Sequence, residues 1–166
     1  LILYLILMKT IPFGDDIRTH REKKRHILKK MIYLIDINKL NIQKTKQLFH
    51  MISPDTEINI VCYDFLKLHN EHKQYFNIKQ FDVILMNPPY NLGGTKSNGQ
   101  KNAWVFFVKQ ALRFLENAGY LVAIHPSCWR INNYRPRATK TDINSVYLSR
   151  KILHVTMLSL IHISEP

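Results

Sequence analysis

The stretch FDVILMNPPYNLGG, Phe81–Gly94, holds the pattern that decides the fold. Its first part, Phe81–Met86, is an apolar run typical of a buried strand. The run ends in Asn87, then two prolines and Tyr90. Because proline lacks the N–H that a strand ladder needs, the strand must stop there. We therefore expect an amide and an aromatic ring at the carboxyl end of a strand.

Similar apolar runs recur along the chain, and helical spacing separates them. Strands are expected over Met31–Ile37, Ile58–Tyr63, Tyr120–His125 and Lys151–Met157. Helices are expected over Asn38–His50, capped by Asn38, over Asn102–Gly119, stopped by Gly119, and over Thr141–Arg150. The run LILYLILM at the start is too short to cross a bilayer, so we expect a buried helix or strand. The alternation predicts an α/β fold with a mostly parallel sheet.

Ligands of such sheets bind outside the carboxyl ends of the strands. The residues at those positions are Asp36, Asp64, Asn87 and His125. A carboxylate at Asp36 can accept from both hydroxyls of a ribose, although a helix cap or a loop charge is equally compatible. Asp64 can accept from an adenine amino group with Phe65 on the ring; the alternative is a strand-end turn with a core Phe.

The residues after Met86 offer two acceptors with no donor nearby. They are the side-chain oxygen of Asn87 and the carbonyl of Pro88, stiffened by Pro89. A planar amino group could donate one hydrogen to each, and Tyr90 could stack on the ring that bears it. The alternative is a Pro-Pro turn that only ends the strand.

The charge favours a polyanionic partner. The net charge is +12 and the pI about 9.8, which suits nucleic acid, although a solvated basic surface would look the same. Candidate phosphate contacts are Lys96 and Lys101 in a polar loop, and a cluster of Arg130, Arg135 and Arg137. The loop is not a P-loop, because Gln100 stands where lysine is needed. Cys62 and Cys128 form neither a disulfide framework nor a metal site, so a reducing interior is expected.

These motifs resemble those of amino-methylating methyltransferases. DVILMNPPY is similar to motif IV, YLIDIN to the acidic motif II, and VCYDF to motif III. The helix–strand segment ending LVAIHPS resembles the one that comes after motif IV in DNA adenine methyltransferases of the restriction–modification and viral type. The resemblance covers roughly Arg18–Arg130.

The resemblance implies a Rossmann-like class I methyltransferase sheet with helices on both faces, and S-adenosylmethionine as donor. Asp36 would bind the donor's ribose, Ile37 would pack beside its adenine, and Asp64 and Phe65 would hold that adenine. Asn87 would belong to the donor site as well. Asn87, Pro88, Pro89 and Tyr90 would hold the target amino group of an adenine flipped out of double-stranded DNA. Neither a metal nor a membrane is required, and a cytoplasmic location in a bacterial, phage-infected or virus-infected cell follows. Alternatives are an RNA guanine or protein glutamine methyltransferase, and a non-catalytic nucleic-acid-binding remnant.

One part of the family pattern is not found. None of the five glycines forms the glycine-rich motif I, and LILYLILMKTI looks like the helix that comes after it. We therefore expect the first, central strand and the target-recognition region to be missing, leaving a partial catalytic domain over residues 1–157. Residues 158–166, LSLIHISEP, look like a translated sequencing adapter and are expected to lie outside the fold.

Overall fold

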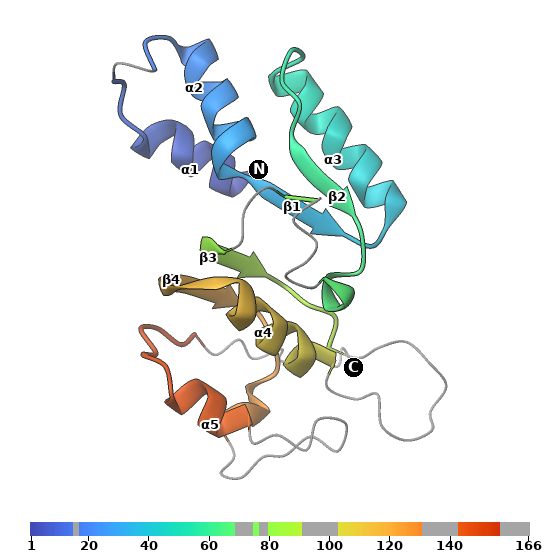
Figure 1. Cartoon of the computed structure of the whole chain (residues 1–166), viewed down its shortest axis with the longest axis vertical. Helices are drawn as coiled ribbons and strands as arrows, with labels where there is room; N and C mark the ends of the chain where they lie inside the picture. The colour runs from blue at the N-terminus through green and yellow to red at the C-terminus, as the bar shows by residue number, and fades with distance from the viewer. Residues whose placement is uncertain (15–16, 69–74, 77–79, 91–102, 131–142, 157–166) are drawn as a thin grey trace, which may run out of the picture. The chain divides into compact units, whose positions relative to one another are not determined.

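The chain contains helices and four short strands among its described residues, and the strands form two parallel pairs (Figure 1). The computed structural model describes residues 1–14, 17–68, 75–76, 80–90, 103–130 and 143–156. The chain divides into two compact units, Leu1–Lys79 and Gln80–Pro166, and each is described by itself.

The first unit is built on the parallel pair β1 and β2. Its elements are α1 (Ile2–Thr10), α2 (His20–His26), η1 (Ile27–Met31), β1 (Tyr33–Asp36), α3 (Lys39–Ile52), β2 (Asn59–Cys62) and η2 (Phe65–Lys67). In the sheet, Asp36 lies opposite Cys62, so both strands end at one edge. The predicted strands and the predicted helix are confirmed, as is the cap: the Asn38 side chain accepts from the Leu40 N–H.

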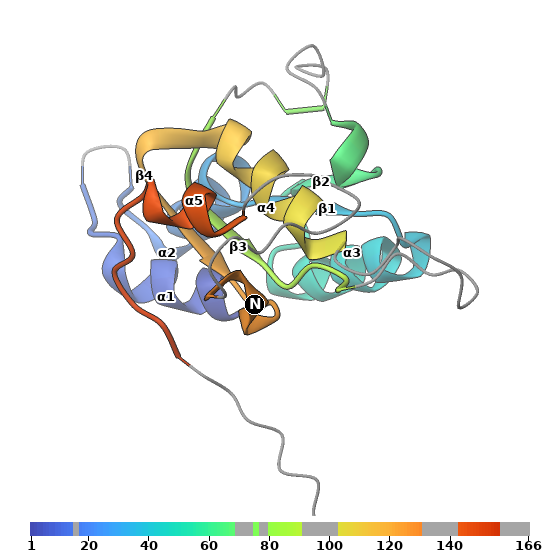
Figure 2. The same cartoon turned by 90° about the horizontal axis from the view of Figure 1, so that it is seen from below.

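Helices α1 and α3 lie on the same side of β1 and β2 (Figure 2). Tyr4 of α1 and Phe49 of α3 meet edge to face, with ring centroids 6.0 Å apart, and Leu34 of β1 packs against their cluster. On the opposite face, Tyr33 contacts Phe76 at 5.4 Å. The N-terminal run is helical, but the expectation that it is buried holds for only part of it. Only Tyr4 is fully buried there, and Ile2 is 76% exposed.

The charged segment before β1 is helical, which the sequence pattern did not predict. A capping box between Thr19 and Glu22 begins α2. At the carboxyl end of η1, which follows α2, the Asn59 side-chain amide donates to the carbonyl oxygens of Leu28, Lys29 and Ile32 at 3.2, 3.0 and 3.1 Å. Asn59 of β2 thereby fixes how η1 enters β1.

The second unit is built on the parallel pair β3 and β4. Its elements are β3 (Phe81–Met86), α4 (Ala103–Phe114), β4 (Leu115–Ala123), η4 (Ser127–Arg130) and α5 (Ile143–Leu148). One sheet face packs against α4 and α5 through Met86, Leu121 and the fully buried Trp104, Val105, Val108 and Ile143. The other face exposes about half of each of Val83, Leu85, Tyr120 and Val122.

The helix predicted to reach Gly119 ends at Phe114, so that boundary was wrong. Leu115 already pairs with Phe81, and its carbonyl accepts from the Gln80 side chain at 3.2 Å. Because Leu115 is paired with a strand and its carbonyl accepts from a side chain, its backbone groups cannot continue the helix. Gly119 lies instead within β4, where an added Cβ would be 2.9 Å from the Asp82 carbonyl oxygen. The glycine serves close approach, not a helix stop.

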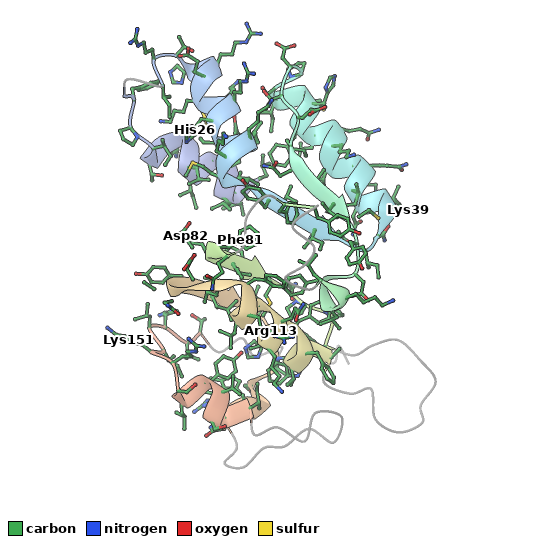
Figure 3. The ribbon with its side chains drawn as sticks, viewed as in Figure 1. His26, Lys39, Phe81, Asp82, Arg113 and Lys151 are labelled. Atoms are coloured by element: carbon green, nitrogen blue, oxygen red, sulfur yellow. The ribbon has the colours of Figure 1, made fainter. Side chains whose placement is uncertain are left out.

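Residues 115 and 120 of β4 pair with residues 81 and 83 of β3, so β4 carries a bulge of four residues opposite one. Phe81 and Asp82 mark the start of β3 in Figure 3. Regular pairing resumes at Tyr120 and continues to the carboxyl ends, where Met86 lies opposite Ala123.

The predicted fifth strand was also wrong. Residues 151–156 have no regular structure and are exposed; Met157 lies outside the described residues. An apolar run cannot form a strand without a paired neighbour. The described residues form a mixed α/β structure with two small parallel sheets. A single Rossmann-like sheet, helices on both faces, a missing central strand and the bounds 1–157 and 158–166 stay predictions.

Candidate functional site

The Asp36 carboxylate is held in place at the end of β1. Oδ1 accepts from the backbone N–H of Asn38 at 2.7 Å, and Oδ2 accepts from the side chain of Asn41 at 2.9 Å. Because each carboxylate oxygen can accept two hydrogen bonds, each keeps one free position. The helix cap is Asn38, not Asp36. Lys39, labelled in Figure 3, begins α3 beside this edge.

The chain after β2 lies against the same edge. The Tyr63 N–H donates to the Asp36 carbonyl at 3.1 Å, and the Cys62 Sγ is 3.7 Å from the Ile37 carbonyl. Ile37 is 69% exposed, which is high for an isoleucine. It offers an apolar surface next to a carboxylate.

Asp64 caps the turn that begins η2. Its Oδ1 accepts from the Leu66 N–H at 3.0 Å, which confirms the strand-end turn that the sequence offers as the alternative for Asp64. Its Oδ2 lies 4.0 Å from the Lys67 ammonium and can still accept another bond. Phe65, the next residue, begins η2 and is half-buried.

This edge carries groups that could hold the adenosine part of a nucleoside donor. It brings together Asp36, Ile37 and Asp64, which supply oriented acceptors and one exposed apolar side chain. Ribose hydroxyls and an adenine amino group are donors that such oxygens accept. The sequence has no glycine-rich loop for the rest of the donor, so the fit concerns the adenosine part alone.

The segment after β3 is held by its backbone at both ends. The carbonyl of Met86, directly before it, accepts from the Ile124 N–H at 3.1 Å, and the Tyr90 carbonyl accepts from the Ala103 N–H at 2.9 Å. Between them Pro88 is buried, whereas Asn87 and Pro89 are exposed. Tyr90 is 42% exposed. Within the described part of the chain, no hydrogen bond of the Asn87 side-chain amide is found.

His125 comes after the neighbouring strand and is the centre of an aromatic group. Its ring is stacked on Trp104 at 4.5 Å with an interplanar angle of 1°, and lies 5.5 Å from the ring of Tyr147. The Tyr147 hydroxyl is 2.6 Å from Nε2, and Nδ1 is 2.8 Å from the Pro126 carbonyl. Burial lowers the pKa of His125, partly offset by the bond to Pro126. Burial also raises the pKa of Tyr147.

The sequence predicts which residues end the strands, but not the side chains that bond to them or stack on them. Asn41, Trp104 and Tyr147 come from helices, and only the fold brings them to Asp36 and His125. For Asn41 a signal was present, since an amide in the first turn of a helix after a strand can reach back to the strand end. No comparable signal marks Tyr147, which is 22 residues away from His125 along the chain.

The predicted phosphate contacts are mostly outside the described residues. That holds for Lys96, Lys101, Arg135 and Arg137, whereas Arg130 ends η4 and is exposed. Among the residues that the structure describes, no group of three or more histidine, cysteine, aspartate or glutamate side chains could hold a metal ion. No helix in those ranges is long and apolar enough to cross a membrane.

Comparison with known proteins relates the chain to DNA methylases. A protein of Mycoplasma pneumoniae (strain ATCC 29342 / M129 / Subtype 1), described as an uncharacterized adenine-specific methylase, is 37% identical over 79 residues. The match covers 43% of this chain and 18% of that relative, so the chain spans less than a fifth of it. The family model of the Eco57I restriction-modification methylase matches residues 13–156, which include both strand pairs and every described candidate residue. The chain therefore belongs to the family of Eco57I restriction-modification methylases.

Proposed function

We propose that the protein transfers a methyl group from S-adenosylmethionine to the exocyclic amino nitrogen of adenine in double-stranded DNA. The donor supplies an electrophilic methyl group when it is bound. The Asp36 carboxylate would accept from its ribose hydroxyls, Ile37 would cover one side of its adenine, and Asp64 with Phe65 would hold the adenine amino edge. In support, Asp36 and Ile37 lie at one edge with Asp64, and each carboxylate keeps an acceptor position.

Asn87 and Pro88 would hold the target amino group. The observation that carries this role is the exposed Asn87 amide at the end of a strand, unpartnered among the described residues, on a segment bonded at both ends. The Asn87 side-chain oxygen and the Pro88 carbonyl would each accept one amino hydrogen. Tyr90, 42% exposed beside them, would stack on the base, while Pro89 keeps the backbone stiff.

The chemistry explains why two acceptors suit this reaction. An exocyclic amino nitrogen conjugates into its ring, so its lone pair is a weak nucleophile. Two acceptors draw the amino group toward tetrahedral geometry and stabilise the positive charge that develops on nitrogen. Hydrogen bonds to a charged group contribute about 1.5–3 kcal/mol each, so two of them supply a useful part of the rate enhancement. Alignment of the reacting atoms must supply much of the rest.

DNA would be bound through its phosphates and the target base flipped out of the duplex. Arg130 is an exposed basic residue at the end of η4. The further candidates for phosphate contacts are Lys96, Lys101, Arg135 and Arg137. The net charge of +12 supports such a partner. A metal ion would have no part in the transfer.

The test is methyl transfer by the protein expressed from its complete gene, including any sequence that flanks residues 1–166. Labelled S-adenosylmethionine is supplied with unmethylated duplex DNA, with ribosomal RNA or with a glutamine-containing release factor. The products are digested and the labelled nucleoside or amino acid is identified by mass. Label in N6-methyladenine of DNA is the expected result.

The other outcomes identify the alternatives. Label in RNA guanine or in glutamine would overturn the choice of substrate, since the Asn-Pro-Pro-Tyr pattern serves several planar nitrogens. Binding of nucleic acid without transfer to any substrate would favour a non-catalytic role.

Asn87→Ala tests the residue role. Loss of one bond to a developing charge should reduce kcat roughly 10- to 150-fold. Binding of DNA should change little, because phosphate contacts supply most of it. Asn117→Ala is the matched control, since Asn117 is an exposed asparagine in the bulge of β4. Equal kcat values for wild type and Asn87→Ala would refute the role.

A further inference from the structure

The His125 ring joins three elements of the second unit. It comes after β4, stacks on Trp104 at the start of α4, and meets Tyr147 of α5. Trp129 of η4 lies 4.8 Å from the Tyr147 ring and extends the group. Trp104 is fully buried, and His125 and Tyr147 are largely so.

The two hydrogen bonds of the imidazole fix its tautomer. The Pro126 carbonyl oxygen can only accept, so Nδ1 must carry the hydrogen of that 2.8 Å bond. In the neutral ring Nε2 is then the acceptor, and the Tyr147 hydroxyl donates to it at 2.6 Å. Burial, which lowers the pKa of His125, favours this neutral form. The ring is therefore oriented by a donor on one side and an acceptor on the other.

The aromatic group is connected to both ends of the segment Asn87–Tyr90, which is proposed to hold the target amino group. The Ile124 N–H, one residue before His125, donates to the carbonyl of Met86, one residue before Asn87. The Ala103 N–H, one residue before Trp104, donates to the carbonyl of Tyr90. Movement of His125 against Trp104 would therefore shift the two anchors of the segment relative to each other.

The choice of side chains indicates more than filling of space. The Trp104 indole N–H is buried without a hydrogen-bond partner among the described residues, which is unfavourable. Leucine or methionine would fill the position without that cost. What the indole adds is a large flat surface parallel to the imidazole.

We propose that His125 is a positioning residue for methyl transfer, held by Trp104 and Tyr147 so that Asn87 and Tyr90 keep a fixed separation. This rests on the proposed function. His125 takes no part in proton transfer in this role; it acts through the backbone bonds of its neighbours.

The decisive variant is Tyr147→Phe, which removes one hydroxyl and leaves the ring in place. The complete gene product is assayed for kcat and for KM of S-adenosylmethionine. We expect kcat to fall about five- to tenfold, as for loss of one buried hydrogen bond that matters in the transition state. The KM of the donor should stay within about twofold, because Asp36, Ile37 and Asp64, which are proposed to bind its adenosine part, belong to the other unit.

A second readout separates positioning from stability. The Tyr147 hydroxyl favours neutral His125, so its loss should move the acid limb of the kcat–pH profile to higher pH. His125→Leu should lower kcat further than His125→Gln, since glutamine can still donate and accept. Tyr120→Phe is the matched control: Tyr120 is 57% exposed on β4 and outside the aromatic group, so kcat and the acid limb should be unchanged.

The outcomes are distinct. Unchanged kcat and an unmoved acid limb in Tyr147→Phe, with an active wild type, would overturn the positioning role and leave the proposed function intact. Failure of the wild type to methylate DNA would overturn the proposed function, and with it the reaction that His125 serves.

Discussion

Asn59 should contribute strongly to stability, because one amide serves three carbonyl groups. Its Nδ2 lies 3.2, 3.0 and 3.1 Å from the carbonyl oxygens of Leu28, Lys29 and Ile32. Two N–H hydrogens can make the equivalent of two full bonds, shared among three acceptors. At about 0.5–1.5 kcal/mol net for each bond, Asn59→Ala should lower the free energy of unfolding by about 1–3 kcal/mol. Leu28 and Ile32 are buried, which favours the upper part of that range.

Asn59→Asp sharpens the test because it keeps the shape of the side chain. It replaces the donor with a carboxylate oxygen that faces three carbonyl oxygens, so it should destabilise more than alanine does. Urea unfolding of the whole chain, monitored by circular dichroism, gives both values if the m-value is unchanged. Asn117→Ala, in the exposed bulge, should stay within about 0.5 kcal/mol of wild type.

Two results would refute this reasoning. One is Asn59→Ala indistinguishable from Asn117→Ala, which would mean that water replaces the amide without loss. The other is Asn59→Asp more stable than Asn59→Ala, which would mean that the carbonyl groups do not converge on this side chain.

Three further predictions concern the candidate site. Asn41→Ala frees one side of the Asp36 carboxylate and should weaken binding of S-adenosylmethionine to the complete gene product about two- to tenfold, measured by calorimetry; an unchanged Kd would show that the Asn41 bond does not orient Asp36. Cys62 is exposed and lies opposite Asp36 in the sheet, so in a Cys128→Ser background saturating donor should slow its alkylation by N-ethylmaleimide. Equal alkylation rates with and without donor would contradict the proposed place of the donor. His125 has a lowered pKa in the folded chain, so below about pH 6.5 the unfolded chain takes up the proton first, and stability present above that pH is lost as pH falls. His125→Gln should lose less stability than wild type between about pH 7.5 and 5.5 in urea unfolding, and parallel curves would count against a buried neutral imidazole.

Strand patterns were reliable where a strand has a partner. The apolar runs that became β1, β2 and β3 were recognised, because each is short, rich in β-branched or large apolar residues, and bounded by polar residues or proline. The run at residues 151–156 has the same composition but remains irregular. The composition of a segment indicates that it could form a strand, but not whether a neighbouring strand is present to pair with it.

The end of α4 could not be read from local rules. Gly119 looked like a helix stop, but pairing of Leu115 with Phe81 ends the helix five residues earlier. The glycine is required by the Asp82 carbonyl of another strand, a contact that no local pattern contains. Tertiary pairing overrode propensity here.

The site showed the same division. The strand-end positions of Asp36 and Asn87 could be predicted, because the apolar runs before them form β1 and β3; their roles toward a ligand stay predictions. The residues that orient them depend on helix packing. The contact of Tyr147 with His125 exists only because α5 packs in the cluster that includes Trp104 and Val108.

The four-residue bulge of β4 has a consequence for how the length of related chains can vary. Residues inserted between Leu115 and Gly119 would enlarge a part of β4 that is already out of register with β3, at a small entropic cost. Both anchors of the Asn87 segment lie outside it and would not move. One residue gained or lost between Tyr120 and His125 would instead turn the side chains on one side of the change to the opposite face of the sheet. Length differences among relatives should therefore collect before Tyr120, and the spacing from Tyr120 to His125 should be constant.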